Sequence, residues 1–203
     1  MKVALIDYGA GNVASVERAL RRLGTESTRV STPECLADAA ALVLPGVGHF
    51  AALIRALDER GLRVPLLEAL QRGVPSLGIC LGLQALYDSS EEAPDLRGLQ
   101  VLPGKIQALP ANVKLPHMGW NQLKMTGPSR LLDGIPRDAR FYFAHSYAAK
   151  VENHGGHEVA TCTHGSEFTA VLERDNINAV QFHPEKSGAA GAQLLQNFLR
   201  LAS

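Results

Sequence analysis

Residues 76–82 read Ser-Leu-Gly-Ile-Cys-Leu-Gly, and this stretch determines the fold that we expect. The apolar run at 76–79 is typical of a short buried strand, and a helix is expected over 83–87. A cysteine between two glycines at such a strand-to-helix turn has the form of a nucleophile elbow, a tight turn that presents a reactive side chain. Glycines fit there because neighbouring backbone approaches too closely for a Cβ atom, while the nucleophile itself is strained.

The elbow would also activate Cys80. A helix N-terminus stabilises a thiolate, which is the reactive form of cysteine, and the Leu81 amide would point at a developing oxyanion. The same residues also fit a buried structural cysteine, because free cysteines often serve as small core side chains. The stretch alone leaves both interpretations open.

Strands and helices alternate on both sides of the elbow. We expect strands at 2–7, 25–30 and 41–44, and helices at 13–23 with Asn12 as the N-cap, from 32 with Pro33 in first position, at 50–60 and at 65–73. After about residue 98 the pattern becomes β-like, with strands at 141–144, 157–162, 168–173 and 179–182, and a last helix spans 189–201. The order predicts one α/β domain over residues 1–203, with a mostly parallel central sheet, helices on both faces and an antiparallel β elaboration in the second half.

A histidine with a companion acid follows the last of these strands. Residues 181–185 read Gln-Phe-His-Pro-Glu, so His183 and Glu185 are two positions apart. In an extended chain such residues share one face, and a carboxylate beside an imidazole fixes its tautomer and stabilises its cation. The alternative is an ordinary surface pair, since the chain has 7 histidines.

A glycine-rich loop follows the strand at 41–44. Residues 45–48 read Pro-Gly-Val-Gly, and open α/β sheets place ligand loops at such strand ends. Its unshielded amides could reach the same oxyanion as the Leu81 amide. The alternative is an ordinary βα turn, for which a Pro-Gly pair is equally common. Together, the three features predict acyl transfer through a thioester at the carboxyl edge of the sheet.

Composition excludes several other classes. The 203 residues carry 20 Lys+Arg and 20 Asp+Glu with 5% aromatic residues, which argues against a nucleic-acid or anionic-membrane surface. No apolar run approaches the roughly 18 residues of a membrane span, and the apolar part of the N-terminus is too short for a signal peptide. Because Cys35, Cys80 and Cys162 form no Cys-x-x-Cys pair, we expect no disulfide framework, no metal, no cofactor and a cytoplasmic setting.

Residues 78–84 and 182–185 resemble, in order and spacing, two motifs of the triad-type (class I) glutamine amidotransferases. Five further stretches narrow the resemblance to the branch that supplies ammonia in histidine biosynthesis: Asp-Tyr-Gly-Ala-Gly-Asn at 7–12, Pro-Gly-Val-Gly at 45–48, His-Met-Gly-Trp-Asn at 117–121, Phe-Ala-His-Ser-Tyr at 143–147 and His-Pro-Glu-Lys-Ser at 183–187. The resemblance covers essentially the whole chain and implies the flavodoxin-like fold of that family.

The resemblance implies a role for each matching residue. Cys80 attacks the side-chain amide carbon of glutamine, His183 takes the thiol proton and later protonates departing ammonia, and Glu185 orients His183. The oxyanion is held by the amide of Leu81 and by a reoriented amide near Val47. Glutamine is bound by Gly48, Gln84, Glu92, His145, Ser146 and Tyr147. Water then resolves the glutamyl thioester to glutamate.

The resemblance also implies a partner. Ammonia released into solvent would be lost as ammonium, so this branch docks on a cyclase subunit with a (β/α)8 barrel fold. There the ammonia is used to form imidazole glycerol phosphate and aminoimidazole carboxamide ribotide. Asn12, Trp120 and Lys186 match interface positions, with a core aromatic as the alternative for Trp120.

Two departures from the family pattern lie outside the triad. Residues 161–165 read Thr-Cys-Thr-His-Gly where Thr-x-Tyr-Gly is frequent, and Ala179 stands where glycine is frequent. Two other functions are left open: a free-standing cysteine hydrolase that acts on γ-glutamyl or peptide bonds, and a flavodoxin-like binding module with an inert Cys80.

Overall fold

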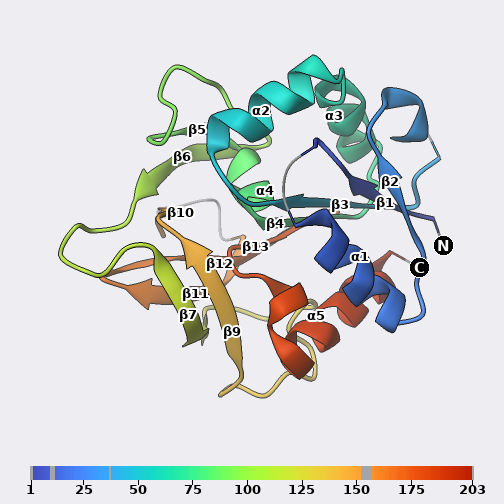
Figure 1. Cartoon of the computed structure of the whole chain (residues 1–203). Coiled ribbons are helices and arrows are strands. Elements are labelled where there is room, and N and C mark those ends of the chain that lie inside the picture. The colour runs from blue at the N-terminus through green and yellow to red at the C-terminus, as the bar shows by residue number, and fades with distance from the viewer. Residues whose placement is uncertain (1, 10–11, 37, 152–156, 203) are drawn as a thin grey trace.

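A computed structural model describes residues 2–9, 12–36, 38–151 and 157–202. Ala10 and Gly11, which belong to the stretch at 7–12, lie outside the described residues. The described residues form one eight-stranded sheet and two smaller ones (Figure 1). None of the helices in the described ranges has both the length and the apolar character needed to cross a membrane.

The large sheet has the order β2-β1-β3-β4-β13-β12-β11-β8. Its first five strands pair in parallel, and β12, β11 and β8 continue it antiparallel. The strand bounds are β1 Val3–Ile6, β2 Ser27–Val30, β3 Ala41–Gly46, β4 Ser76–Cys80, β13 Ile177–Val180, β12 Ser166–Arg174, β11 Glu158–His164 and β8 Lys124–Met125. The predicted α/β architecture with an antiparallel extension is therefore confirmed.

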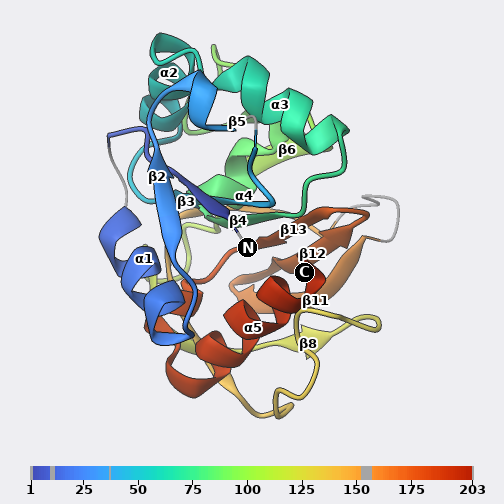
Figure 2. The same ribbon diagram turned by 90° about the vertical axis from the view of Figure 1, so that its right-hand side faces the viewer.

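Helices cover both faces of the sheet, as Figures 1 and 2 show. One face carries α2 (Phe50–Glu59), α3 (Arg63–Gln71) and α4 (Leu81–Ala85), and the other carries α1 (Val13–Arg22) and α5 (Gly188–Leu201). Along β1 the side chains alternate between the two cores: Ala4 and Ile6 pack into one, Val3 and Leu5 into the other. A strand buried on both faces reads as a continuous apolar run, which explains why these strands are recognisable in the sequence.

The two small sheets pack on opposite faces. The strands β5 (Tyr87–Ser90), β6 (Leu102–Ala108) and β10 (Tyr147–Ala149) form one of them, and Tyr87, Leu102, Ile106 and Ala149 join the core on the α2–α4 face. The hairpin-like pair β7 (His117–Gln122) and β9 (Arg140–His145) buries Phe141 and Phe143 in the core on the α1 and α5 face. Two short 3-10 turns complete the chain, η1 (Pro33–Leu36) and η2 (Pro184–Lys186).

The predicted helix at 83–87 is wrong in its bounds. The helix α4 begins at Leu81 and ends at Ala85, and Tyr87 starts strand β5 instead. Tyr87 is fully buried and pairs in parallel with Leu102 of β6. This long-range pairing outweighs the local helical spacing, which by itself carries only a weak preference.

Candidate active site

Cys80 lies at a strained turn between β4 and α4. Its backbone has φ 53° and ψ −106°, in a region that residues with a side chain rarely adopt. The flanking glycines are required by space. A Cβ on Gly78 would lie 3.0 Å from backbone atoms of Gly82, and one on Gly82 would lie 1.9 Å from the carbonyl oxygen of Leu44. The turn therefore has the tight geometry that the sequence predicts for an elbow.

The glycine-rich loop packs directly against this turn. Gly46 ends β3 opposite Cys80 in the parallel register, and a Cβ on Gly46 would come within 2.8 Å of the Gly82 nitrogen. Gly48 has φ 102°, a conformation that favours glycine. The carboxyl ends of β3 and β4 therefore meet at one point.

His183 and Glu185 reach the same edge from the neighbouring strand β13. Oε1 of Glu185 lies 2.9 Å from Nδ1 of His183, and both side chains are at most 2% exposed. Extended backbone at His183 followed by the turn η2 keeps the two side chains together. Nδ2 of Asn12 donates to the same Glu185 oxygen at 3.3 Å. Asn12 is thus the residue before α1, as predicted, but its side chain makes no cap hydrogen bond.

The protonation of His183 is set by its neighbours. Burial lowers the pKa of His183, but the adjacent Cys80 thiol and Glu185 carboxylate outweigh burial and raise it to about 10. At neutral pH the ring therefore holds a proton. Nε2 is buried and makes no hydrogen bond of ordinary geometry with the described residues, although Cys80 is close enough to raise the pKa of the ring.

A cavity of about 220 Å³ opens beside Cys80. Its lining includes every residue predicted to hold glutamine or its oxyanion, together with Pro116 and Ala144: Val47, Gly48, Cys80, Leu81, Gln84, Glu92, Pro116, Ala144, His145, Ser146 and Tyr147. Pro116 and Ala144 were not expected, since neither residue type carries a chemical signal. The structure therefore brings together residues that are as far apart in the sequence as Val47 and Tyr147.

The side chains of Glu92 and Gln84, both predicted to bind glutamine, are hydrogen-bonded within the protein. Oε2 of Glu92 accepts a hydrogen bond of 2.7 Å from the backbone N–H of Phe50, so the carboxylate is anchored at the start of α2. Nε2 of Gln84 donates to the carbonyl of Tyr147 at 2.8 Å and to Oε1 of Gln181 at 3.1 Å. Through this nitrogen, Gln84 connects Tyr147 of the pocket wall with Gln181.

A buried histidine pair stands behind the pocket. Nδ1 of His145 faces the carbonyl of Tyr147 at 2.9 Å, and since a carbonyl only accepts, the proton is on Nδ1. Nε2 of His145 then accepts from Nδ1 of His117 at 3.1 Å, and Nε2 of His117 accepts from Asn121 at 3.3 Å. Burial lowers the pKa of His117 to about 4 and that of His145 to about 3, so both rings are neutral. His117 and Asn121 share one face of β7 because they are four residues apart in a strand. This spacing could have indicated their hydrogen bond from the sequence.

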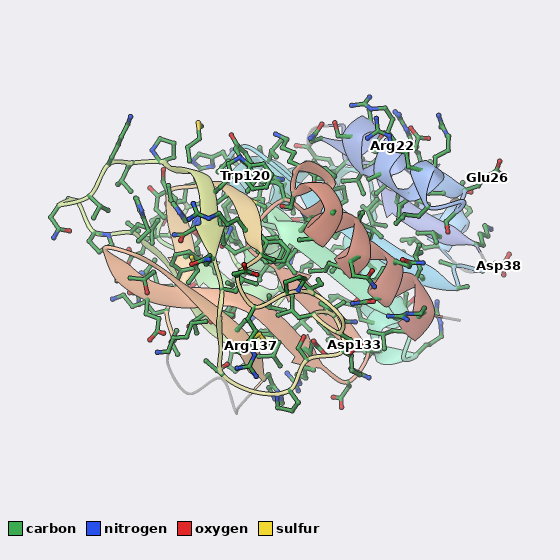
Figure 3. The ribbon with its side chains drawn as sticks, turned by 90° about the horizontal axis from the view of Figure 1, so that it is seen from below. Arg22, Glu26, Asp38, Trp120, Asp133 and Arg137 are labelled. Atoms are coloured by element: carbon green, nitrogen blue, oxygen red, sulfur yellow. The ribbon has the colours of Figure 1, made fainter. Side chains whose placement is uncertain are left out.

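The predicted interface positions lie at one surface, except Asn12. Trp120 on β7 is 52% exposed and makes an edge contact with Tyr142 at 6.0 Å, and Nζ of Lys186 lies 5.6 Å from the centre of the same Tyr142 ring. Figure 3 shows Trp120 at the surface over β7. The alternative of a core aromatic for Trp120 is therefore wrong. Asn12 is turned instead toward Glu185.

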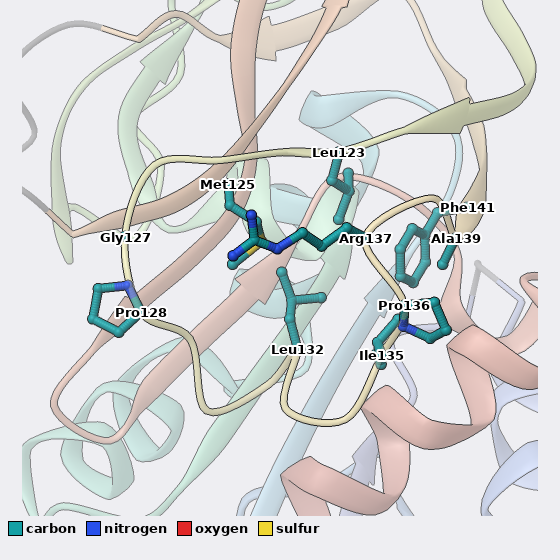
Figure 4. A pocket seen from close by; sticks show the side chains of 10 residues that line it. All are labelled: Leu123, Met125, Gly127, Pro128, Leu132, Ile135, Pro136, Arg137, Ala139 and Phe141. Atoms are coloured by element: carbon teal, nitrogen blue, oxygen red, sulfur yellow. The ribbon is translucent and has the colours of Figure 1, made fainter.

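A second cavity of about 410 Å³ shares no lining residue with the first. Figure 4 shows its mostly apolar walls, which include Leu132, Ile135 and Phe141, with Arg137 as the charged side chain. Arg137 and Trp120 occupy different parts of the surface in Figure 3. This cavity contains no nucleophile, and the chemistry therefore belongs to the cavity beside Cys80.

Comparisons with known proteins agree with this geometry. Residues 4–202 match the family model described as "Glutamine amidotransferase class-I". The chain is 48% identical over 199 residues to "Imidazole glycerol phosphate synthase subunit HisH" of Methanothermobacter thermautotrophicus, with 98% of each chain covered. It is 42% identical to "Imidazole glycerol phosphate synthase hisHF, chloroplastic" of Arabidopsis thaliana, where the match covers 97% of this chain and 34% of the plant protein. A solved structure titled "Crystal structure of glutamine amidotransferase" has a TM-score of 0.79 at 22% identity, with 98% of each chain covered.

Proposed function

The chain belongs to the class-I glutamine amidotransferase family, and we propose that it is the glutaminase subunit of an imidazole glycerol phosphate synthase, acting as one domain over residues 1–203. It hydrolyses glutamine to glutamate and ammonia, and the ammonia passes to a cyclase subunit. The observation that carries this proposal is the strained Cys80, which adjoins the buried His183–Glu185 pair and lines a cavity of about 220 Å³.

The reaction starts from the thiolate. Sγ of Cys80 attacks the side-chain amide carbon of glutamine, and the carbonyl electrons move onto oxygen. The backbone N–H of Leu81 stabilises this oxyanion, and the N–H of Val47 does so after the loop reorients. When the oxyanion collapses, the carbon–nitrogen bond breaks and His183 gives its proton to the leaving nitrogen, which departs as ammonia.

Water completes the cycle. His183, now neutral, takes a proton from water as the oxygen attacks the thioester carbonyl. The carbon–sulfur bond breaks, glutamate leaves, and the thiolate–imidazolium pair is restored. Throughout, Glu185 holds the ring through Nδ1, so that Nε2 faces the reacting atoms. Oε2 of Glu92 accepts from the start of α2, and Oε1, which accepts no hydrogen bond from the described residues, binds the substrate ammonium group.

The plant relative supports a partner subunit. The chain matches about a third of that longer synthase, so most of the plant protein consists of other sequence. We propose a cyclase of (β/α)8 barrel fold as the partner, which uses the ammonia to form imidazole glycerol phosphate and aminoimidazole carboxamide ribotide. Trp120, Tyr142 and Lys186 supply an exposed aromatic and cationic surface next to Glu185, where ammonia could leave. Free thiols at Cys80 and Cys162 fit a cytoplasmic location.

The test is glutamine turnover by the chain with and without a cyclase subunit. We expect slow turnover alone and a large rise with the ligand-bound cyclase, because the partner completes the oxyanion site. Fast turnover that the partner does not change would instead indicate a free-standing hydrolase. A glutamine-mimicking electrophile should label Cys80 and block turnover; failure to label it would indicate a binding module.

A second measurement addresses the transfer of ammonia. In the reconstituted pair, cyclase product formed from glutamine should be insensitive to an ammonia-scavenging enzyme in the solvent, whereas product formed from external ammonium should be sensitive to it. Equal sensitivity would show that ammonia equilibrates with solvent and would contradict channelling.

A further inference from the structure

The proposed reaction leaves Gln181 without a role, although it lies two residues before His183. Its side chain is fully buried, and its backbone N–H donates to the carbonyl of Ala170 at 3.0 Å, which fixes the residue next to β12. Nε2 of its side chain donates to Sγ of Cys80 at 3.6 Å. A buried amide therefore contacts the reacting sulfur atom directly.

The orientation of this amide is determined by its neighbours. The Tyr147 carbonyl can only accept, so the group of Gln84 that faces it at 2.8 Å must be the nitrogen. The second hydrogen of that nitrogen goes to Gln181 at 3.1 Å, which must therefore present its oxygen to Gln84. The nitrogen of Gln181 is then left to face the sulfur, and a flipped amide would break two hydrogen bonds.

A thiolate at this position needs such a donor. The helix α4 has only five residues, so the dipole at its N-terminus is small. His183 lies close enough for Cys80 to raise its pKa, but its Nε2 makes no hydrogen bond of ordinary geometry with the described residues. The hydrogen bond of ordinary geometry that Sγ accepts comes from Gln181, and hydrogen bonds to ionised acceptors are stronger than those to neutral ones.

We propose that Gln181 is a further residue of the catalytic machinery, whose amide N–H stabilises the Cys80 thiolate and holds its sulfur in the attacking position. Gln84 is the positioning residue, because it acts on the sulfur only through Gln181. The inference rests on the proposed function, since it adds a donor to the same thioester chemistry. In this division, the amides of Leu81 and Val47 donate to the oxyanion of the substrate, and the side chain of Gln181 donates to the sulfur of Cys80.

The experiment is alkylation of the full chain by iodoacetamide across the range from pH 5 to 10, followed by mass spectrometry of the Cys80 peptide. Gln181→Met keeps the length of the side chain and removes the donor. We expect the pH midpoint of Cys80 alkylation to rise by about one unit, which lowers the rate about tenfold at any pH below the midpoint. Burial raises the pKa of Cys162 to about 12, so that thiol does not compete.

The matched control is Asn178→Leu. Asn178, on β13, also has a buried side-chain amide, but this amide donates to the carbonyl of Ser76 and not to the sulfur. Its removal should leave the midpoint unchanged, whereas Gln84→Leu, which frees the Gln181 amide, should raise the midpoint by less than Gln181→Met does. A midpoint in Gln181→Met equal to that of the control would overturn the proposal.

Two features keep the test decisive. If Gln181→Met does not fold by circular dichroism, Gln84→Leu decides alone, and an unmoved midpoint there overturns the proposal. Alkylation by iodoacetamide needs neither glutamine nor a partner. Its outcome is therefore separate from that of the turnover experiment, and a chain without glutaminase activity could still show the shift.

Discussion

A methyl group on Gly82 is the most direct perturbation of the elbow. In the structure, a Cβ there lies 1.9 Å from the carbonyl oxygen of Leu44 and 3.0 Å from its carbonyl carbon. A non-bonded carbon and oxygen need about 3.3 Å, so one of the two backbones in Gly82→Ala must move by about 1.4 Å. Both belong to regular elements, β3 and α4, and neither can give way like a flexible side chain.

The displacement has two consequences of different size. Overpacking of this kind costs about 1–3 kcal/mol of unfolding free energy. The larger effect is on catalysis, because Cys80 is two residues away and a misplacement of about 1 Å can reduce a rate about 100-fold. We therefore expect a folded, moderately destabilised protein with a kcat for glutamine at least tenfold lower.

Urea unfolding and glutaminase assays on the same preparation separate these effects. Gly127→Ala is the matched control, since nothing lies within 4 Å of a Cβ there and its φ is not positive. The control should stay within about 0.5 kcal/mol of the original stability and retain its activity. A Gly82→Ala protein as stable and as active as the control would refute the steric argument for the elbow.

Three further predictions concern the triad, the histidine pair and the partner surface. Glu185→Gln should retain measurable glutaminase activity, because the ring loses its orienting charge but the nucleophile remains, whereas Cys80→Ala should have none; equal, total loss would indicate another role for Glu185. Burial holds the pKa of His117 at about 4, below the roughly 6.5 of an exposed histidine, so the unfolded chain binds more protons and the unfolding free energy should fall as the pH drops from about 6.5 toward 4. In urea unfolding across that range, His117→Phe should show a shallower fall, and an unchanged slope would contradict the assigned pKa. Trp120→Ala should weaken binding of the cyclase by about 2 kcal/mol in titration calorimetry, and Val64→Ala, exposed on α3, is the control; equal affinities would remove Trp120 from the interface.

The sequence predicts what short-range geometry determines. The elbow follows from Gly78, Cys80 and Gly82, because only this spacing allows a strand to turn into a helix with backbone in such close contact. The pairing of His183 with Glu185 follows from the two-residue period of extended chain. The parallel sheet follows from apolar runs that are buried on both faces.

What the sequence does not predict is determined by long-range contacts. Tyr87 has helical spacing with the residues before it, but it joins β5 because a strand about 15 residues later pairs with it. Asn12 has the side chain of an N-cap, but the buried Glu185 carboxylate competes for its amide. Gln181 carries no local signal for sulfur, since its orientation depends on Gln84 and Tyr147 from two other elements.

The protonation of the triad indicates which step limits the isolated chain. The pKa of His183 is raised to about 10, so its ring holds a proton at neutral pH, and we expect attack to depend on polarisation of the substrate carbonyl. The elbow fixes the Leu81 amide for that task. The pairing of β3 with β4 ends at Gly46 opposite Cys80, so the Val47 amide that we propose as the second donor lies in the loop beyond the sheet. His183 and Glu185, in contrast, are already paired. We therefore expect a partner to raise activity by moving the loop at 45–48 rather than by rearranging the triad.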